Sequence, residues 1–154
     1  MEMDKFDSEL NSILVEVYHN ILHLEEQALK KANGISLSIS EMHLLEAVGK
    51  GDENGRSISE IADDLNITRP SATIAVNKLE KKGYLEKLNC KDDGRVVRVH
   101  LTREGKVVDR YHQYYHKNMV REISSDFTEE EKTYLLKAIY KLNDYFKKGI
   151  GENK

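Results

Sequence analysis

The chain has 154 residues and a formal net charge of −3, which suits one domain with its own core and argues against a nonspecific nucleic-acid coat protein. Its single cysteine, Cys90, excludes an intrachain disulfide and a cysteine-based metal cluster. The acidic N-terminal sequence and the shortness of every apolar run predict neither a signal peptide nor a membrane span. We therefore expect a cytoplasmic protein without a membrane partner.

The charge is distributed unevenly along the chain. The formal net charge is −6 over residues 1–56, +2 over residues 57–110 and +1 over residues 111–154. The middle third is thus the relatively basic part. Because charged runs are most often solvated faces, this gradient alone is weak support for an anionic partner.

Helix signals are strong at both ends of the chain. Apolar residues recur at steps of three and four over residues 6–31, which predicts a long helix ended by Asn33-Gly34. A second helix is expected over residues 39–50. Three capping boxes, each a hydroxyl residue followed by glutamate three positions later, mark helix starts: Ser38 and Glu41, Ser57 and Glu60, Thr128 and Glu131.

Residues 57–83 are predicted to form two helices joined by a three-residue turn. Thr68 can cap the second helix, and Pro70 lies where a missing N–H costs nothing. Apolar residues fall on one face of each helix: Ile58, Ile61, Ala62 and Leu65 on the first, and Ala72, Ala75, Val76 and Leu79 on the second. This order is typical of a helix-turn-helix motif, whose second helix enters the major groove of DNA.

The outer face of the second helix and its cap carry hydroxyl, amide, apolar and cationic side chains. We take these residues as candidates for DNA binding: Thr68, Arg69, Ser71, Thr73, Ile74, Asn77, Lys78 and Lys81. Hydroxyl groups can bind base edges and phosphates, asparagine can bind adenine in two places, and cations neutralise phosphates. An ordinary helical hairpin with a solvated outer face fits this pattern alone equally well.

A β-hairpin is predicted directly after this helix. Residues 84–88 and 96–101 alternate with a period of two, and Asp92-Asp93-Gly94-Arg95 supplies the turn. A hairpin in this place is a wing, and its tip would lie beside the minor groove, where negative potential attracts an arginine. Arg95 is therefore the candidate groove probe, and Asp93 is placed to orient its guanidinium group. The alternative is a turn with a surface salt bridge of little energetic value.

Three stretches together resemble the MarR family of winged-helix transcriptional regulators: SISEIADDLNITRPSATIAVNKLEKKGYLEK, then Asp93-x-Arg95, then HLTREGK. The resemblance implies a mainly α fold with a small β-hairpin wing (α+β) in one domain, residues 1–154. Residues 36–101 would form the winged helix-turn-helix part, and residues 1–35 and 102–154 a helical dimerisation part. It also implies a homodimer that binds a double-stranded operator. Consistent with this, residues 111–146 carry more apolar and aromatic side chains than one small winged helix can cover.

Within the family, residues 38–50 and 110–123 resemble the regulators that repress fatty-acid synthesis genes. For those repressors the corepressor is a long-chain acyl group on acyl carrier protein, which makes acyl-acyl carrier protein a possible partner. An acyl chain needs an apolar tunnel, for which the candidate residues are Leu14, Tyr18, Ile21, Leu45 and Met119, each of which could equally be plain core. Arg69-Pro70 departs from the expected pattern, so no operator sequence is carried over.

Two alternatives to the acyl corepressor are another small-molecule ligand and a metal ion bound by the histidines. His112 and His116 are four residues apart on one expected helix face, and His43 could complete a site, as in zinc-sensing MarR-type repressors. Carboxylates and histidines that could take part are Glu41, Glu25, Glu26, His19 and His23. We favour the reading in which these histidines only form hydrogen bonds, so no metal and no cofactor is expected. No phosphate-binding glycine loop or nucleophile motif is present in the sequence, and an enzyme is not expected.

Overall fold

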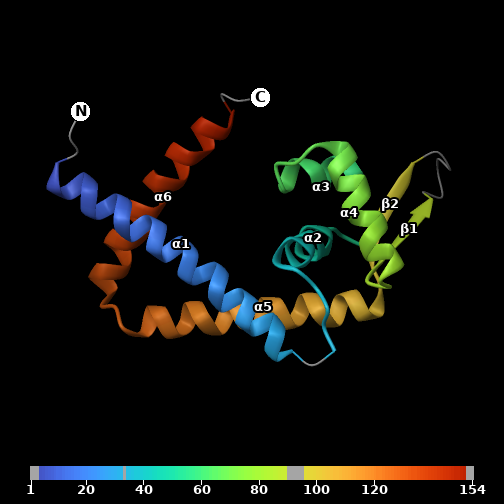
Figure 1. The fold of residues 1–154 in the computed structure, drawn as a ribbon, viewed down its shortest axis with the longest axis horizontal. Coiled ribbons are helices and arrows are strands. Elements are labelled where there is room, and N and C mark those ends of the chain that lie inside the picture. The colour runs from blue at the N-terminus through green and yellow to red at the C-terminus, as the bar shows by residue number, and fades with distance from the viewer. Residues whose placement is uncertain (1–3, 33, 90–95, 152–154) are drawn as a thin grey trace. The chain divides into compact units, whose positions relative to one another are not determined.

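The computed structural model describes residues 4–32, 34–89 and 96–151. Within them the elements are α1 (Lys5–Lys31), α2 (Ile39–Gly49), α3 (Ile58–Asp64), α4 (Arg69–Lys81), β1 (Leu85–Asn89), β2 (Val97–Leu101), α5 (Arg103–Ser125) and α6 (Glu129–Gly151) (Figure 1). The mainly α fold with a β-hairpin wing, expected from the sequence, is confirmed. The chain divides into two compact units within α5: the winged unit, residues 1–112, and the C-terminal unit, residues 113–154.

Local capping chemistry sets the helix starts, as predicted. All three expected capping boxes form, joining Ser38 with Glu41, Ser57 with Glu60 and Thr128 with Glu131. Thr68 caps α4 by accepting a hydrogen bond from the backbone N–H of Ser71. The cap of α1 is Ala32, just before the predicted Asn33-Gly34, of which Asn33 lies outside the described residues. Helix ends fray, which explains why the other predicted ends differ slightly from the observed ones.

The wing is an antiparallel pair that receives a third short contribution. β1 pairs with β2 so that Leu85 lies opposite Leu101 and Asn89 opposite Val97. Arg56 adds an isolated bridge to Val99, with its N–H donating to the Val99 carbonyl at 3.0 Å and its carbonyl accepting from the Val99 N–H at 2.8 Å. A bridge of one residue has no alternation to detect, so the sequence did not predict it.

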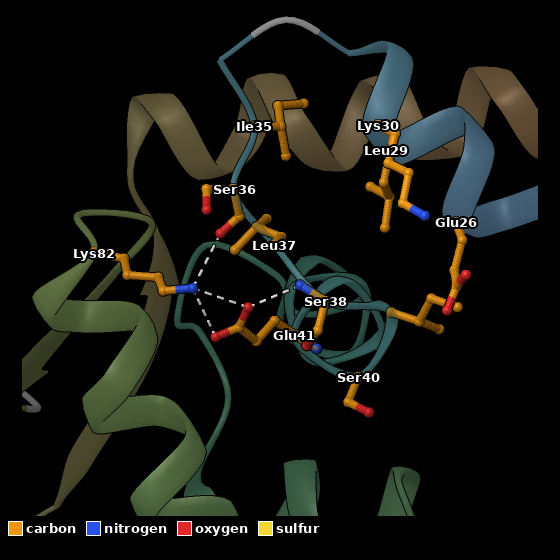
Figure 2. Close-up of a pocket in the computed structure, with 11 residues that line it drawn as sticks. Glu26, Leu29, Lys30, Ile35, Ser36, Leu37, Ser38, Ser40, Glu41 and Lys82 are labelled. Carbon is orange, nitrogen blue, oxygen red and sulfur yellow. Dashed lines mark hydrogen bonds and ion pairs between the residues drawn. The ribbon is translucent and has the colours of Figure 1, made fainter.

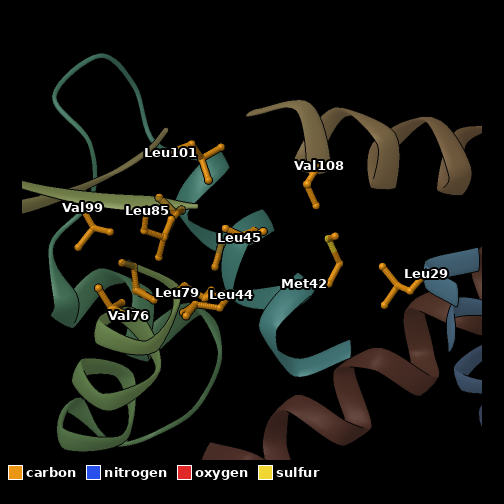
Figure 3. Packing of buried hydrophobic residues seen from close by; sticks show 13 residues of the cluster. Leu29, Met42, Leu44, Leu45, Val76, Leu79, Leu85, Val99, Leu101 and Val108 are labelled. Carbon is orange, nitrogen blue, oxygen red and sulfur yellow. The ribbon is translucent and has the colours of Figure 1, made fainter. Parts of the chain in front are cut away.

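The core of the winged unit fixes α4 against the rest of the fold. Figure 3 shows Val76 and Leu79 of α4 pointing toward Leu85 and Val99 of the hairpin, beside the side chains of α2. All four are at most 2% exposed. Burying an aliphatic side chain of this size stabilises a fold by about 1.5–3 kcal/mol. The core therefore holds the opposite face of α4 toward solvent.

The hairpin and α5 are joined by a segment whose backbone packs closely against residues 83–84. The hydroxyl of Thr102 donates to the Gly83 carbonyl at 2.7 Å and accepts from the Gly105 N–H at 3.1 Å. The Thr102 N–H donates to the Tyr84 carbonyl at 3.1 Å. A Cβ at Gly105 would clash with that same carbonyl oxygen. The Leu-Thr-x-x-Gly pattern of residues 101–105 is thus explained by a threonine cap followed by a close backbone approach.

The C-terminal unit consists of the second part of α5 and the helix α6. α6 has no buried residue. Its exposed large apolar side chains, between 40% and 74% accessible, are Tyr134, Leu135, Leu136, Ile139, Tyr140, Tyr145, Phe146 and Ile150. Such a helix leaves an extensive apolar surface without cover inside its own unit. Among the residues that the structure describes, no helix is long and apolar enough to cross a membrane.

Candidate nucleic-acid interface

The outer face of α4 gathers most of the predicted DNA-binding residues. Ala72, Val76 and Leu79 are fully buried, whereas Ile74 on the opposite side is 70% exposed. Thr68, Arg69, Ser71, Thr73, Lys78 and Lys81 are exposed, and Asn77 is half-buried. Arg95, the predicted groove probe of the wing, and Asp93, its predicted partner, lie outside the described residues. The helix therefore presents a mixed polar, cationic and apolar surface of the kind that fits a major groove.

The hydroxyl groups at the start of α4 already have partners. The Thr68 hydroxyl accepts from the Ser71 N–H at 3.3 Å and lies 2.8 Å from the Ser71 hydroxyl. The Thr73 hydroxyl donates its proton to the Arg69 carbonyl at 2.9 Å. Because a hydroxyl has one proton, Thr73 is left with acceptor capacity and a methyl group for an outside partner.

A buried carboxylate anchors the C-terminal end of α4. Figure 2 shows the Lys82 ammonium reaching Glu41 of α2 and the Ser36 carbonyl in the segment between α1 and α2. The distances are 2.9 and 3.0 Å to the two Glu41 oxygens and 3.0 Å to the Ser36 oxygen. Lys78 lies 2.9 Å from the same carboxylate yet stays 62% exposed. Lys78, a predicted phosphate ligand, is thus also part of this anchor.

This environment changes the acidity of Glu41. Burial alone would raise its pKa, but hydrogen bonds from Lys82, the Ser38 backbone and Lys78 lower the pKa from 4.5 to about 2. The carboxylate is 8% exposed and stays ionised throughout the neutral range. It also lines a surface pocket of about 620 Å³ formed by the end of α1, residues 35–41 and Lys82 (Figure 2).

Glu41→Gln is expected to lower the free energy of unfolding at pH 7 by about 2–3 kcal/mol. Because the pKa in the folded state lies below the unfolded value, the ionised group stabilises fully above pH 4.5 and progressively less as the pH falls toward 2. The difference from wild type should therefore shrink between pH 4.5 and pH 3. Urea unfolding at pH 7, 4.5 and 3 measures it, with the exposed Glu104→Gln as control. A difference that stays constant down to pH 3 would contradict the assignment.

Two arginines support the hairpin, and the sequence did not single them out. Arg98 of β2 lies 2.8 Å from the carboxylate of Glu60, the capping-box residue of α3. The Arg56 guanidinium donates to the Ala47 carbonyl at 2.6 Å and to Asp64 at 3.0 Å. The wing is therefore tied to the helices before α4. The sequence carried one signal for Arg98. Because side chains alternate along a strand, Arg98 lies on the opposite face from its neighbours Val97 and Val99.

The histidines of the winged unit lie beside carboxylates. His43 Nε2 is 3.5 Å from Glu25, His112 Nδ1 is 3.8 Å from Glu46, and the two imidazole centroids are 6.1 Å apart. Glu41, one of the carboxylates suggested for a metal site, is held by two lysines. His23 is 2.8 Å from the Gln27 amide nitrogen. His116 belongs to the C-terminal unit.

The residues suggested for an acyl tunnel lie in different environments. Leu45 is fully buried in the core of the winged unit, so lining a tunnel would require that core to open. On α1, Tyr18 is 61% and Ile21 41% exposed, while Leu14 is half-buried. Met119 belongs to the C-terminal unit. Within the winged unit, the buried Leu45 and the more exposed side chains of α1 therefore lie in different environments.

The comparisons with known proteins agree with this geometry. The sequence pattern of the MarR family matches residues 34–96. The regulator PecS of Dickeya dadantii is 32% identical over 114 residues, which cover 73% of this chain and 69% of PecS. The uncharacterised regulator YhjH of Bacillus subtilis is 28% identical over 137 residues, or 77% of each protein.

A solved structure extends the likeness to nearly the whole chain. The crystal structure of Streptococcus pneumoniae FabT in complex with DNA superposes with a TM-score of 0.85 and 31% sequence identity, covering 92% of this chain and 97% of that one. PecS and YhjH are named as helix-turn-helix transcriptional regulators. The chain therefore belongs to the MarR family of DNA-binding, winged-helix transcriptional regulators.

Proposed function

We propose that this protein is a homodimeric repressor of fatty-acid synthesis genes whose corepressor is long-chain acyl-acyl carrier protein. The observation that carries the proposal is the likeness to DNA-bound FabT over almost the full length of both chains. The likeness of residues 38–50 and 110–123 to fatty-acid synthesis repressors points the same way. The proposed ligand contacts in the winged unit are Leu14, Tyr18 and Ile21 of α1, without the fully buried Leu45. Met119, in the C-terminal unit, stays a candidate from the sequence.

The proposed DNA contact places α4 in the major groove. Arg69, Lys78 and Lys81 would neutralise phosphates, while Thr73, Ile74 and Asn77 would face base edges. Thr68 and Ser71, which cap the helix, would contact the backbone beside its N-terminus. Arg95, oriented by Asp93, would enter the neighbouring minor groove.

A dimer would give the interface its second half. The apolar surface of α6 is uncovered within the C-terminal unit, and burying it against a second copy is the simplest way to remove it from water. Two copies of α4 would then meet successive major grooves about 34 Å apart. A near-palindromic operator follows from that symmetry.

Arg95→Ala is expected to weaken binding to a duplex from the protein's own promoter by about 10- to 100-fold, because a groove contact of this kind contributes about 1–3 kcal/mol. Electrophoretic mobility shift measures the affinity, and thermal unfolding should show the stability unchanged. Lys81→Ala serves as the comparison: it should weaken binding to all duplexes alike and reduce the dependence on salt. An unchanged promoter affinity for Arg95→Ala would show that the wing is not part of the DNA interface.

The corepressor is tested by titration of the promoter complex. Acyl carrier protein bearing long acyl chains is expected to raise promoter affinity, and the unacylated carrier should have no effect. A ligand acts only through different affinity for the DNA-binding and nonbinding conformations, so the effect must appear as a shift in the mobility-shift midpoint. Equal midpoints with acylated and unacylated carrier would refute the acyl reading and leave the DNA-binding function intact.

A zinc-responsive repressor is the second candidate. It is favoured by two pairs of zinc-ligand side chains in the winged unit, His43 with Glu25 at 3.5 Å and His112 with Glu46 at 3.8 Å. The same mobility-shift assay with zinc and with a chelator separates the two candidates. A zinc response that His112→Ala abolishes would identify the metal, and not the acylated carrier, as the effector.

A further inference from the structure

The wing strand β1 contacts a side chain on the DNA-facing side of α4. Lys87 Nζ lies 2.7 Å from Asn77 Oδ1 and 3.0 Å from a carboxylate oxygen of Glu80. A lysine ammonium has three donors and no acceptor, so the Asn77 atom that it contacts must be the amide oxygen. The orientation of the Asn77 amide is therefore fixed by chemistry.

We propose that Lys87 is a positioning residue that sets the base preference of Asn77. It holds the amide oxygen toward β1 and leaves the amide nitrogen to act on DNA, so that Asn77 reads base acceptors and does not read adenine through two hydrogen bonds. The inference deepens the proposed function and rests on the proposed entry of α4 into the major groove.

The anchor of this lysine is rigid at both ends. Its backbone lies in the centre of the hairpin, opposite the fully buried Val99. Its ammonium is held between Asn77 and Glu80, which are three residues apart and so adjacent on the surface of α4. The side chains of Lys87 and Glu80 are 32% and 37% exposed. A charge-assisted hydrogen bond of 2.7 Å is at the short, strong end of the range.

The bond changes what Asn77 can recognise. Two-point reading of adenine needs the amide oxygen to accept from the adenine amino group while the amide nitrogen donates to N7. That amino group would have to share the Asn77 oxygen with the Lys87 ammonium, and the partly positive hydrogen atoms of the two donors would repel each other. Guanine offers two adjacent acceptors, N7 and O6, to the amide nitrogen, whereas adenine offers only N7 and loses the second hydrogen bond of the two-point contact.

On the preceding turn of α4, Thr73 offers a hydrogen-bond acceptor where Asn77 offers a donor. The Thr73 hydroxyl donates a hydrogen bond to the Arg69 carbonyl, so it can only accept from DNA, and its methyl group is also available. Asn77 is left as a donor. The outer face of the helix thus offers an acceptor followed by a donor, an order that the sequence alone did not define.

The test is selection of duplexes from a library of randomised sequences, followed by competition between matched duplexes that differ at one base pair. For the wild-type protein, the position that Asn77→Ala relaxes is expected to hold guanine, which offers two acceptors. Lys87→Met should raise the relative affinity for adenine at that position by about tenfold. Lys87→Arg, which keeps a cationic donor, should preserve the wild-type preference. In the Asn77→Ala background, Lys87→Met should have no further effect on base preference.

The outcomes separate this inference from the function on which it rests. If Asn77→Ala changes the preference at one position and Lys87→Met does not, the positioning role of Lys87 is wrong while the recognition role of α4 stands. A uniform loss of affinity for all duplexes with Lys87→Met would make Lys87 a phosphate contact and would overturn the inference. If Asn77→Ala changes no preference at any position, the proposed placement of α4 itself fails. Thermal unfolding of each variant checks that the fold is intact.

Discussion

Gly105→Ala is expected to lower the free energy of unfolding of the winged unit by about 3 kcal/mol, in the range of forced overpacking. The added Cβ would clash with the Tyr84 carbonyl oxygen, which also accepts a hydrogen bond from the Thr102 N–H at 3.1 Å. A backbone oxygen cannot move aside as a flexible side chain can. Either the start of α5 shifts or the hairpin base opens, and both disturb the support of α4.

The same chemical change elsewhere in the chain provides the control. At Gly149 of α6 a Cβ would meet no atom within 4 Å among the described residues, and alanine favours a helix over glycine by about 1 kcal/mol. Gly149→Ala should therefore leave stability unchanged or slightly higher. Urea unfolding followed by circular dichroism measures both variants. Equal stabilities for Gly105→Ala and wild type would show that the backbone between the hairpin and α5 can accommodate a Cβ at this position.

Ile139→Glu combined with Phe146→Glu is expected to convert the proposed dimer into a monomer and to reduce promoter affinity by more than about 100-fold. The two residues are seven apart on one face of α6, and each is 50% exposed within the chain. A charge on each copy at the centre of a buried apolar interface would have to be taken out of water without a partner. Loss of the dimer also removes the second half-site, whose linked contact adds about 10²- to 10⁴-fold to affinity.

The control for this prediction uses the opposite side of the same helix. Lys141 and Lys148 are also seven residues apart and exposed, so Lys141→Glu with Lys148→Glu introduces the same two side chains away from the apolar face. This variant should remain a dimer. Sedimentation equilibrium gives the mass of each variant, and far-ultraviolet circular dichroism checks the helix content. A dimeric Ile139→Glu, Phe146→Glu variant would place the dimer interface off this face.

The sequence by itself determined the order and type of the elements. Each capping box is local, because a hydroxyl and a glutamate three residues apart satisfy each other's neighbouring N–H groups before any tertiary contact forms. Apolar periodicity then defined which face of residues 69–81 is buried, and the structure agrees for Ala72, Val76 and Leu79. The exposed set on α4 follows from the same period, since residues opposite a buried stripe face solvent.

Tertiary structure alone decided which polar side chains meet. Glu41 is held by Lys82, 41 positions later, and Arg98 by Glu60, 38 positions earlier. The link between Lys87 and Asn77 depends on the hairpin folding back along α4. These pairs have no periodic signature, because their distances are set by how separate elements pack. Packing therefore decided which groups on the predicted surface remain available and in which orientation, and that is what a partner molecule encounters.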